Sequence, residues 1–356
     1  IRENFKSMRY LLGVALSLAV FGCNNTPEPK ELTAIQTVEI ERIYEDSVSV
    51  RALEILDDGS VAFAGSNGKY GLYNPATKVW NTAVMKRDNI TPNFRAVAHT
   101  AEDFFMLSIE SPALLYKTGD SGAMELVYEE NDPKAFYDSM TFWNDQEGIA
   151  MGDPTENCIS IIITRDGGNT WTKVSCDNLP EAAAGEAAFA ASNSNIAVYE
   201  NNAWIITGGM KSRVLHTGDK GKTWEVYDTP LKQGTPTTGG YSIDFYDSKL
   251  GVIIGGDYTN AEGNEANKAI THDGGKTWEL LADKAAPGYR SCIQFIPNTE
   301  GKELLAIGFE GIDYSSDQGD TWKNLSSEGF FTVRFLNDST AYAAGSNRIA
   351  KLKFKR

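Results

Sequence analysis

The sequence has little of what metal, redox or nucleotide chemistry requires. It contains three histidines and four cysteines in 356 residues. His99, His216 and His272 are scattered, and none has a second ligand at metal-binding spacing. There is no C-x-x-C pair, and no G-x-G-x-x-G follows a strand into a helix. We therefore expect no metal, no cofactor and no oxidoreductase activity.

Basic residues are also few relative to acidic ones. The chain has 33 Lys and Arg against 48 Asp and Glu, which gives a net charge of −15. An acidic surface of this size repels nucleic-acid phosphates and anionic lipid headgroups. We therefore do not expect a nucleic-acid partner.

The sequence has no apolar run long enough to span a membrane. The run at 10–21 is too short to cross a bilayer but has the length of a signal-peptide core. Met8 precedes it and is taken as the start, with residues 1–7 as upstream sequence. The run ends in V-F-G-C at 20–23, which resembles the lipobox of bacterial lipoproteins, whose cysteine is lipidated.

These features predict three parts of the chain. Residues 1–22 are a signal peptide with upstream residues, residues 23–34 are a lipidated Cys23 with a flexible polar tether, and residues 35–356 fold. The protein would be exported and anchored to a bacterial membrane on its periplasmic or cell-surface side. The alternative is an ordinary secreted protein with Cys23 inside its signal peptide.

Amphipathic helical stretches are scarce, whereas one short motif occurs four times. The copies are T-R-D-G-G-N-T-W at 164–171, T-G-D-K-G-K-T-W at 217–224, T-H-D-G-G-K-T-W at 271–278 and S-S-D-Q-G-D-T-W at 315–322. The spacing of 44 to 54 residues suits one four-stranded blade of a propeller. The sequence therefore predicts an all-β propeller.

The strand pattern predicts seven blades, with six or eight as alternatives because the first two repeats are degenerate. Units near 136–178, 184–229, 240–282 and 288–328 carry the motif, and 93–131 and 48–85 read as degenerate copies. Residues 330–356 supply only three strands, and the alternating segment 35–44 has no blade of its own. Pairing the two ends closes the last blade with the N-terminal strand and removes an open sheet edge.

The repeated turn resembles the Asp-box, or BNR repeat, and its residues have a structural explanation. The Asp accepts hydrogen bonds from its own turn, the Gly adopts a backbone conformation that other residues resist, and the Trp buries a large ring. One carboxylate per turn is a poor ligand set for a cation. The structural residues are Asp166, Gly168, Trp171, Asp219, Gly221, Trp224, Asp273, Gly275, Trp278, Asp317, Gly319 and Trp322.

Export permits disulfides. Cys158 and Cys176 flank the first Asp turn, and a hairpin formed by 158–165 and 170–176 brings their sulfurs to nearly opposite positions. We predict a Cys158–Cys176 disulfide and a buried free thiol at Cys292.

The whole arrangement resembles the Ycf48-like propellers, which are related to photosystem II stability and assembly factors. The most specific stretch is W-N-D-Q-E-G-I-A-M-G-D-P at 143–154 with the Asp turn that follows it. This resemblance implies a seven-bladed, often lipid-anchored scaffold that binds a protein or peptide or assists assembly. It also implies an arginine cluster on one face that is linked to protein binding.

Four arginines are candidates for that cluster. Arg51 and Arg95 occupy matching positions on the first strands of adjacent blades, Arg290 lies near the same place, and Arg334 falls a few residues later on its strand. First strands line the channel of a propeller, so the four are predicted to converge on an anionic ligand at the channel mouth, such as a carboxylate-bearing tail. The alternative is that each arginine forms an ordinary ion pair.

Two further hypotheses have weaker sequence support. Asp257, Glu262 and Glu265 in the loop 255–268 follow no calcium-binding spacing, and a solvated loop explains them better. Sialidases share the Asp-box and need three arginines with a Tyr nucleophile and an acidic partner, but their F/Y-R-I-P motif is absent. With no complete catalytic constellation, we expect a binding protein, and a glycan-directed hydrolase or carbohydrate binder is the second hypothesis.

Overall fold

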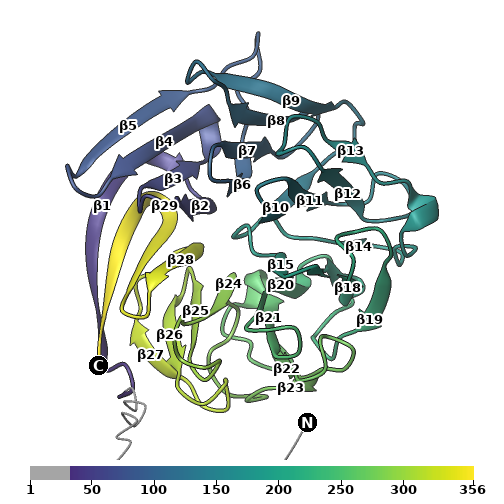
Figure 1. Cartoon of the computed structure of the whole chain (residues 1–356). Helices are drawn as coiled ribbons and strands as arrows, with labels where there is room; N and C mark the ends of the chain where they lie inside the picture. The colour runs from purple at the N-terminus through teal and green to yellow at the C-terminus, as the bar shows by residue number, and fades with distance from the viewer. Residues whose placement is uncertain (1–32) are drawn as a thin grey trace, which may run out of the picture. The chain divides into compact units, whose positions relative to one another are not determined.

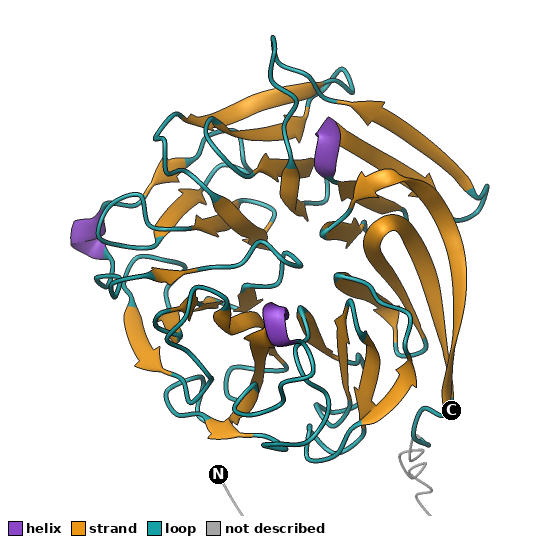
Figure 2. Ribbon diagram, turned by 180° about the vertical axis from the view of Figure 1, so that it is seen from behind, coloured by secondary structure: helices purple, strands orange, loops and turns teal. Residues whose placement is uncertain are grey.

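The computed structural model describes residues 33–356, and these form a ring of seven β-sheets around a central channel (Figures 1 and 2). The predicted signal peptide, Cys23 and nearly all of the tether lie outside the described residues. Within the described chain, no helix is long and apolar enough to cross a bilayer. The helical turns there are η1 (Ser66–Gly68), η2 (Cys176–Asn178) and η3 (Tyr258–Asn260).

Six blades are each built on four antiparallel strands that follow one another outward from the channel, and in blade 5 two short strands extend the sheet. Blade 1 contains β2 (Ala52–Ile55), β3 (Val61–Ala64), β4 (Lys69–Asn74) and β5 (Val79–Val84). Blade 2 contains β6 (Phe94–His99), β7 (Phe104–Ser108), β8 (Ala113–Thr118) and β9 (Met124–Glu130). Blade 3 contains β10 (Tyr137–Asn144), β11 (Glu147–Gly152), β12 (Ser160–Thr164) and β13 (Thr172–Lys173). The two degenerate repeats thus form blades, as predicted.

The next three blades carry the remaining Asp turns. Blade 4 contains β15 (Ile196–Tyr199), β16 (Asn202–Ile206), β18 (Arg213–Thr217) and β19 (Glu225–Asp228). Blade 5 contains β20 (Thr238–Phe245), β21 (Gly251–Asp257), β22 (Lys268–Thr271) and β23 (Glu279–Leu280). Beyond its inner strand β20, the sheet continues with β17 (Gly208–Gly209) and then β14 (Glu186–Ala187). Blade 6 contains β24 (Cys292–Phe295), β25 (Leu304–Gly308), β26 (Gly311–Ser315) and β27 (Lys323–Ser326).

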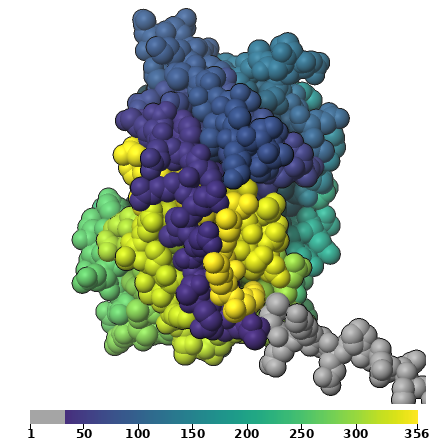
Figure 3. Space-filling model, turned by 90° about the vertical axis from the view of Figure 1, so that its left-hand side faces the viewer, coloured from purple at the N-terminus to yellow at the C-terminus, as the bar shows by residue number. Residues whose placement is uncertain are grey.

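Blade 7 joins the two ends of the described chain. It consists of β28 (Thr332–Asn337), β29 (Thr340–Lys355) and β1 (Thr37–Ser49). The first part of β29 pairs with β28 and the second part pairs with β1, from Thr37 opposite Lys355 onward. The backbone N–H of Phe354 donates to the carbonyl of Ser339, so β29 itself folds back near Asn347, whose φ is 62°. Figure 3 shows the N-terminal strand beside the C-terminal ones at this seam. The predicted closure of the last blade is confirmed.

The core is divided among the interfaces between blades. Seven apolar clusters lie around the ring, and each draws side chains from two neighbouring blades. Trp80, Trp171, Trp224, Trp278 and Trp322 each belong to one of five of these clusters. A blade therefore buries its faces only against the blades beside it.

The Asp turns have the hydrogen bonds expected from the motif. In the second copy, Asp219 accepts from Thr217 Oγ1, from the backbone N–H groups of Lys222 and Thr223, and from Thr223 Oγ1 at 2.7 to 2.9 Å. Gly221 adopts a φ of 83° and donates its N–H to Thr217 Oγ1. Burial raises the pKa of Asp219, but these hydrogen bonds outweigh it and bring the pKa down to about 2.

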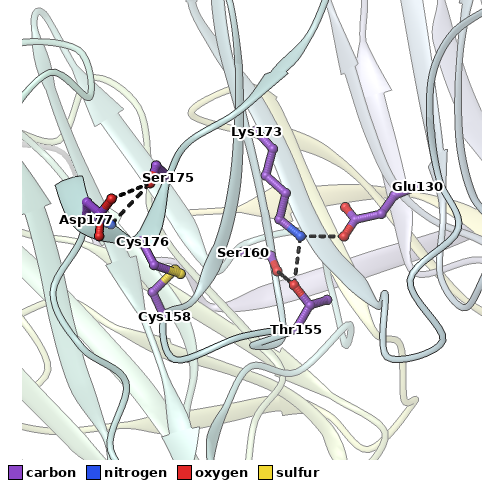
Figure 4. The surroundings of a disulfide bond; sticks show 8 residues. All are labelled: Glu130, Thr155, Cys158, Ser160, Lys173, Ser175, Cys176 and Asp177. Carbon is purple, nitrogen blue, oxygen red and sulfur yellow. Dashed lines mark hydrogen bonds and ion pairs between the residues drawn. A yellow bond between two sulfur atoms is a disulfide. The ribbon is translucent and has the colours of Figure 1, made fainter.

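The predicted disulfide is present. Cys158 and Cys176 are bonded with their Cα atoms 5.5 Å apart. Cys158 lies just before β12 and Cys176 begins η2, so the bond sits at the end of the predicted hairpin (Figure 4). Lys173 on β13 lies nearby and ion-pairs with Glu130 of blade 2. Cys292 is a buried free thiol, as predicted.

An alanine exchange tests the structural role of the Asp turns. Asp219→Ala removes four accepted hydrogen bonds and should lower the free energy of unfolding by about 2 kcal/mol at neutral pH, measured by urea denaturation. Because the folded pKa lies below the ordinary value of 3.8, this stabilisation is present above about pH 4 and is lost as the pH falls toward 2.

The degenerate turn of blade 2 provides the matched control. There, Thr118 Oγ1 donates to Asp103 instead of to Asp120, so Asp120→Ala should change stability by less than about 0.5 kcal/mol. Equal losses in the two variants would contradict the turn-capping role.

Candidate functional site

The central channel is filled by a segment that does not belong to any four-stranded repeat. Residues 188–195, here called the channel segment, connect blade 3 to the first strand of blade 4. Seven of these eight residues are buried, although the segment contains no regular secondary structure. Apart from Phe189, its side chains are small, A-F-A-A-S-N-S-N, and allow the backbone to pass between the inner strands.

Hydrogen bonds join the channel segment to the inner strands of several blades. Asn193 accepts from the N–H of Met140 in blade 3 at 2.9 Å and donates to the carbonyl of Val97 in blade 2 at 2.8 Å. Ser194 Oγ donates to Ser242 Oγ in blade 5 at 2.7 Å. Thr332 Oγ1 in blade 7 donates to the carbonyl of Ser192 at 2.8 Å. The segment thus connects opposite sides of the ring.

The channel segment separates two cavities at the two ends of the inner strands. The first cavity, about 500 Å³, lies where inner strands begin and is called the arginine cavity. The second, about 250 Å³, lies where they end and is called the Glu54 cavity. All inner strands run in the same direction along the channel, so a shift of a few residues along a strand moves a side chain from one end to the other.

Arg51 and Arg95 come together in the arginine cavity. The other charged residue that lines it is Asp153, and the aromatic lining residues are Phe136, Phe189, Tyr241, Tyr258, Tyr289, Phe309 and Phe331. The guanidinium carbon of Arg51 lies 4.1 Å from the centre of the Phe331 ring, and Phe189 stacks on Tyr241 at 3.9 Å. The cavity therefore combines two cations with apolar walls.

Within the described part of the chain, neither arginine forms a direct ion pair, although Asp153 lines the same cavity. Arg51 Nη1 donates weakly to the carbonyl of Ala191 at 3.4 Å, and Arg95 Nη1 to that of Ala190 at 3.5 Å. Among residues 33–356, the buried Nε of Arg51 has no hydrogen-bond partner. Burial and the nearby charge of Arg95 lower the pKa of Arg51 to about 10, which leaves it cationic at neutral pH.

Two acidic groups border this pair from blade 3. Burial raises the pKa of Asp153 to about 6, although the N–H of Ala188 donates to its Oδ1 at 2.8 Å. Asp138 is fully buried, and burial together with the charge of Asp153 raises its pKa well above the ordinary value. Burial lowers the pKa of Arg95, and the nearby carboxyl groups of Asp138 and Glu110 oppose this shift.

The prediction that four arginines converge is wrong for two of them. Arg290 lies at the same end of its blade, but it is buried and its Nε lies 2.6 Å from Asp313 Oδ2. Arg334 lines the Glu54 cavity, where its Nε lies 3.4 Å from Glu54 Oε1. It sits two residues into β28, and that offset along the strand places it at the other end of the channel.

A sialidase-type arrangement is not assembled among residues 33–356. Tyr137 donates to Glu130 at 2.6 Å, but the tyrosine is buried and burial strongly raises its pKa, which opposes nucleophilic action. Tyr241 in the arginine cavity donates to the carbonyl of Thr237 instead of pairing with a carboxylate. In the 255–268 loop, Asp257 accepts from Thr259, and no three acidic, His or Cys side chains of the described chain gather as metal ligands.

Comparisons with known proteins agree with this architecture. The BNR/Asp-box repeat matches residues 269–280, and no curated protein matches the sequence. Ycf48 bound to a D1 peptide is 12% identical, with a TM-score of 0.63 over 91% of this chain and 97% of that chain. Ycf48 from Cyanidioschyzon merolae is also 12% identical, with a TM-score of 0.62 over 90% of this chain and 98% of that chain.

In fold, the chain resembles Ycf48. The predicted resemblance to Ycf48-like Asp-box propellers is thus confirmed for the fold and the repeat. A streptogramin B lyase is equally similar, with 14% identity and a TM-score of 0.66 over 91% of this chain and all of that one. At these sequence identities, the structural similarity establishes the fold alone and identifies no ligand.

The channel segment was not predicted from the sequence, although the sequence contains one signal for it. The stretch between Trp171 and the next apolar strand at Ile196 is longer than the corresponding stretch in the other blades and is rich in Ala, Ser and Asn. A buried irregular segment needs side chains that satisfy backbone groups, and Ser and Asn do so here.

Replacing Asn193 tests the bridging role of the channel segment. Asn193→Ala leaves the buried N–H of Met140 and the carbonyl of Val97 without these partners and should lower the free energy of unfolding by about 3 kcal/mol in urea denaturation. Asn201→Ala, on an exposed turn of blade 4, should change it by less than about 0.5 kcal/mol. Similar values for the two variants would contradict the bridging role.

Proposed function

We propose that the protein is a scaffold that binds a carboxylate-bearing peptide in the arginine cavity. The observation that carries this proposal is the pair Arg51 and Arg95, two half-buried cations that donate to backbone carbonyls and form no direct ion pair among residues 33–356. A buried charge without a partner is costly, and a bound anion would remove that cost.

The chemistry of the pair favours a carboxylate. A guanidinium group donates two parallel hydrogen bonds that match the two oxygens of a carboxylate. The ring of Phe331 lies against the Arg51 guanidinium and restricts its orientation.

The rest of the cavity favours a peptide over a small anion. Its volume of about 500 Å³ lies in the usual range of ligand sites, and most of its lining is aromatic or alanine. Tyr241, Tyr258 and Tyr289 supply rigid contact area for apolar side chains next to the carboxylate. A peptide with an acidic group and apolar neighbours uses both features.

The comparison with Ycf48 supports this proposal without deciding it. One of the Ycf48 structures is bound to a D1 peptide, so a propeller of this architecture is able to hold a peptide. The glycan-directed alternative would require a tyrosine paired with a carboxylate at the site. In the arginine cavity of the described chain, Tyr241 donates to a backbone carbonyl instead.

We also propose that the protein is exported and lipid-anchored through Cys23. The supporting observations are the signal-like run at 10–21, the V-F-G-C sequence at 20–23 and the Cys158–Cys176 disulfide, which is typical of exported proteins.

Peptide binding tests the arginine cavity. In a library of fluorescent hexapeptides, those with a free C-terminal carboxylate should be selected over their amidated counterparts. Arg51→Ala and Arg95→Ala should each weaken binding of a selected peptide about tenfold in fluorescence anisotropy, because each removes a charge-assisted hydrogen-bond pair.

The control is Arg87→Ala, which removes an exposed arginine that pairs with Glu129 far from the cavity. It should leave the dissociation constant unchanged. Unaltered binding in both the Arg51 and Arg95 variants, with folded protein shown by circular dichroism, would overturn the proposal.

Metabolic labelling tests the anchor. In a bacterial host fed an alkyne-tagged fatty acid, the full chain should acquire the label and fractionate with membranes, and Cys23→Ser should abolish both. Cys292→Ser serves as the control because that thiol is buried in blade 6 and should leave the label unchanged. Labelling that survives in Cys23→Ser would refute lipidation at this residue.

A further inference from the structure

Most interfaces between blades contain a tryptophan that lies in or just before the fourth strand of the later blade. Trp171 of blade 3 packs against Phe105 of blade 2 and Phe142, with ring centres 6.4 and 5.7 Å apart. Trp224, Trp278 and Trp322 lie in the clusters between blades 3 and 4, 4 and 5, and 5 and 6. Trp80 occupies the interface of blades 7 and 1. An indole ring is therefore the usual filler of these spaces.

Among the described residues, two interfaces lack this ring, the one between blades 6 and 7 and the one between blades 1 and 2, and an open groove lies at the second. In blade 3, Ile163 pairs with Thr172, so the register places Trp171 opposite Thr164. In blade 2, the connecting turn is one residue shorter and Thr118 pairs with Met124. Met124 thus holds the position that tryptophan holds in blade 3, and its cluster contains no tryptophan among the described residues.

An open groove lies where the ring is missing. It has a volume of about 540 Å³ and is bordered by blades 1 and 2, which lie side by side in Figure 1. Leu56, Tyr70, Leu72, Phe104 and Met124 form its apolar lining. Leu72 is 40% exposed, although its side chain faces this groove. The smaller methionine leaves this apolar surface open to solvent.

The rim of the groove is acidic. Asp57, Asp58 and Glu102 line it and are exposed. Asp57 lies 3.8 Å from His99 Nε2, and Asp103 is paired with Lys117 at 3.0 Å. No Lys, Arg or His of residues 33–356 is part of the lining. The rim therefore attracts a ligand whose apolar group is flanked by positive charge.

We propose that this blade 1–2 groove binds a large aromatic side chain, tryptophan by size, presented by a partner protein next to Lys or Arg. In five other interfaces, the equivalent space holds an indole ring from the chain itself. The groove therefore suits an indole ring presented by another chain. The acidic rim then selects basic neighbours of that ring. The groove is a second site, independent of the arginine cavity, and it favours the opposite charge.

Three short peptides distinguish the contributions of ring and charge. The methyl resonance of Met124 in methionine-labelled protein reports directly on the groove. Acetyl-Lys-Trp-Lys-amide should shift this resonance saturably, and acetyl-Glu-Trp-Glu-amide should bind about tenfold more weakly because attraction is replaced by repulsion at two positions. Acetyl-Lys-Ala-Lys-amide should produce no saturable shift.

Two exposed leucines provide the matched variants. Leu72→Ala should weaken binding of the Lys-Trp-Lys peptide several-fold, since Leu72 supplies part of the apolar wall. Leu336→Ala changes a residue of similar exposure, 43%, on β28 of blade 7 and should leave binding unchanged. A Met124 resonance that does not respond to the Lys-Trp-Lys peptide, or that responds equally to all three peptides, would overturn the proposal.

Discussion

The structure depends on backbone pairing between β1 and the second part of β29. Each blade buries its apolar faces only against its neighbours, so an open row of blades would leave two faces and one sheet edge exposed. Closing the ring between strands at the two ends of the described chain removes these exposed surfaces together. The seven clusters between blades then support one another around the circle.

The channel segment turns this ring into a protein with two different ends. Without it, side chains at the start and the end of the inner strands would face one continuous channel. With Asn193 bonded to blades 2 and 3, the arginine cavity and the Glu54 cavity become separate environments. Arg334 forms an ion pair with Glu54, whereas Arg51 and Arg95 donate long hydrogen bonds to backbone carbonyls. The same residue type is structural at one end and available for a ligand at the other.

Departures from the repeat matter as much as the repeat itself. The complete Asp turns are occupied by their own hydrogen bonds, and their tryptophans fill the interfaces. The arginine cavity and the blade 1–2 groove lie where the pattern changes: at the insertion before β15 and at Met124 in blade 2. A repeat protein thus acquires asymmetric sites by altering single units while the remaining units keep the ring stable.

The sequence by itself determined the propeller, the blade order, the closing strand and the disulfide. These follow from local signals, since Asp219 and Trp224 act within or next to their own turn and strand alternation is a short-range pattern. It also placed Arg51 and Arg95 on matching positions of adjacent inner strands. Only the tertiary structure decided that Arg290 pairs with Asp313 and that Arg334 lies at the other end of the channel. Those outcomes depend on contacts between strands distant in sequence and on the path of residues 188–195, which no repeat period encodes.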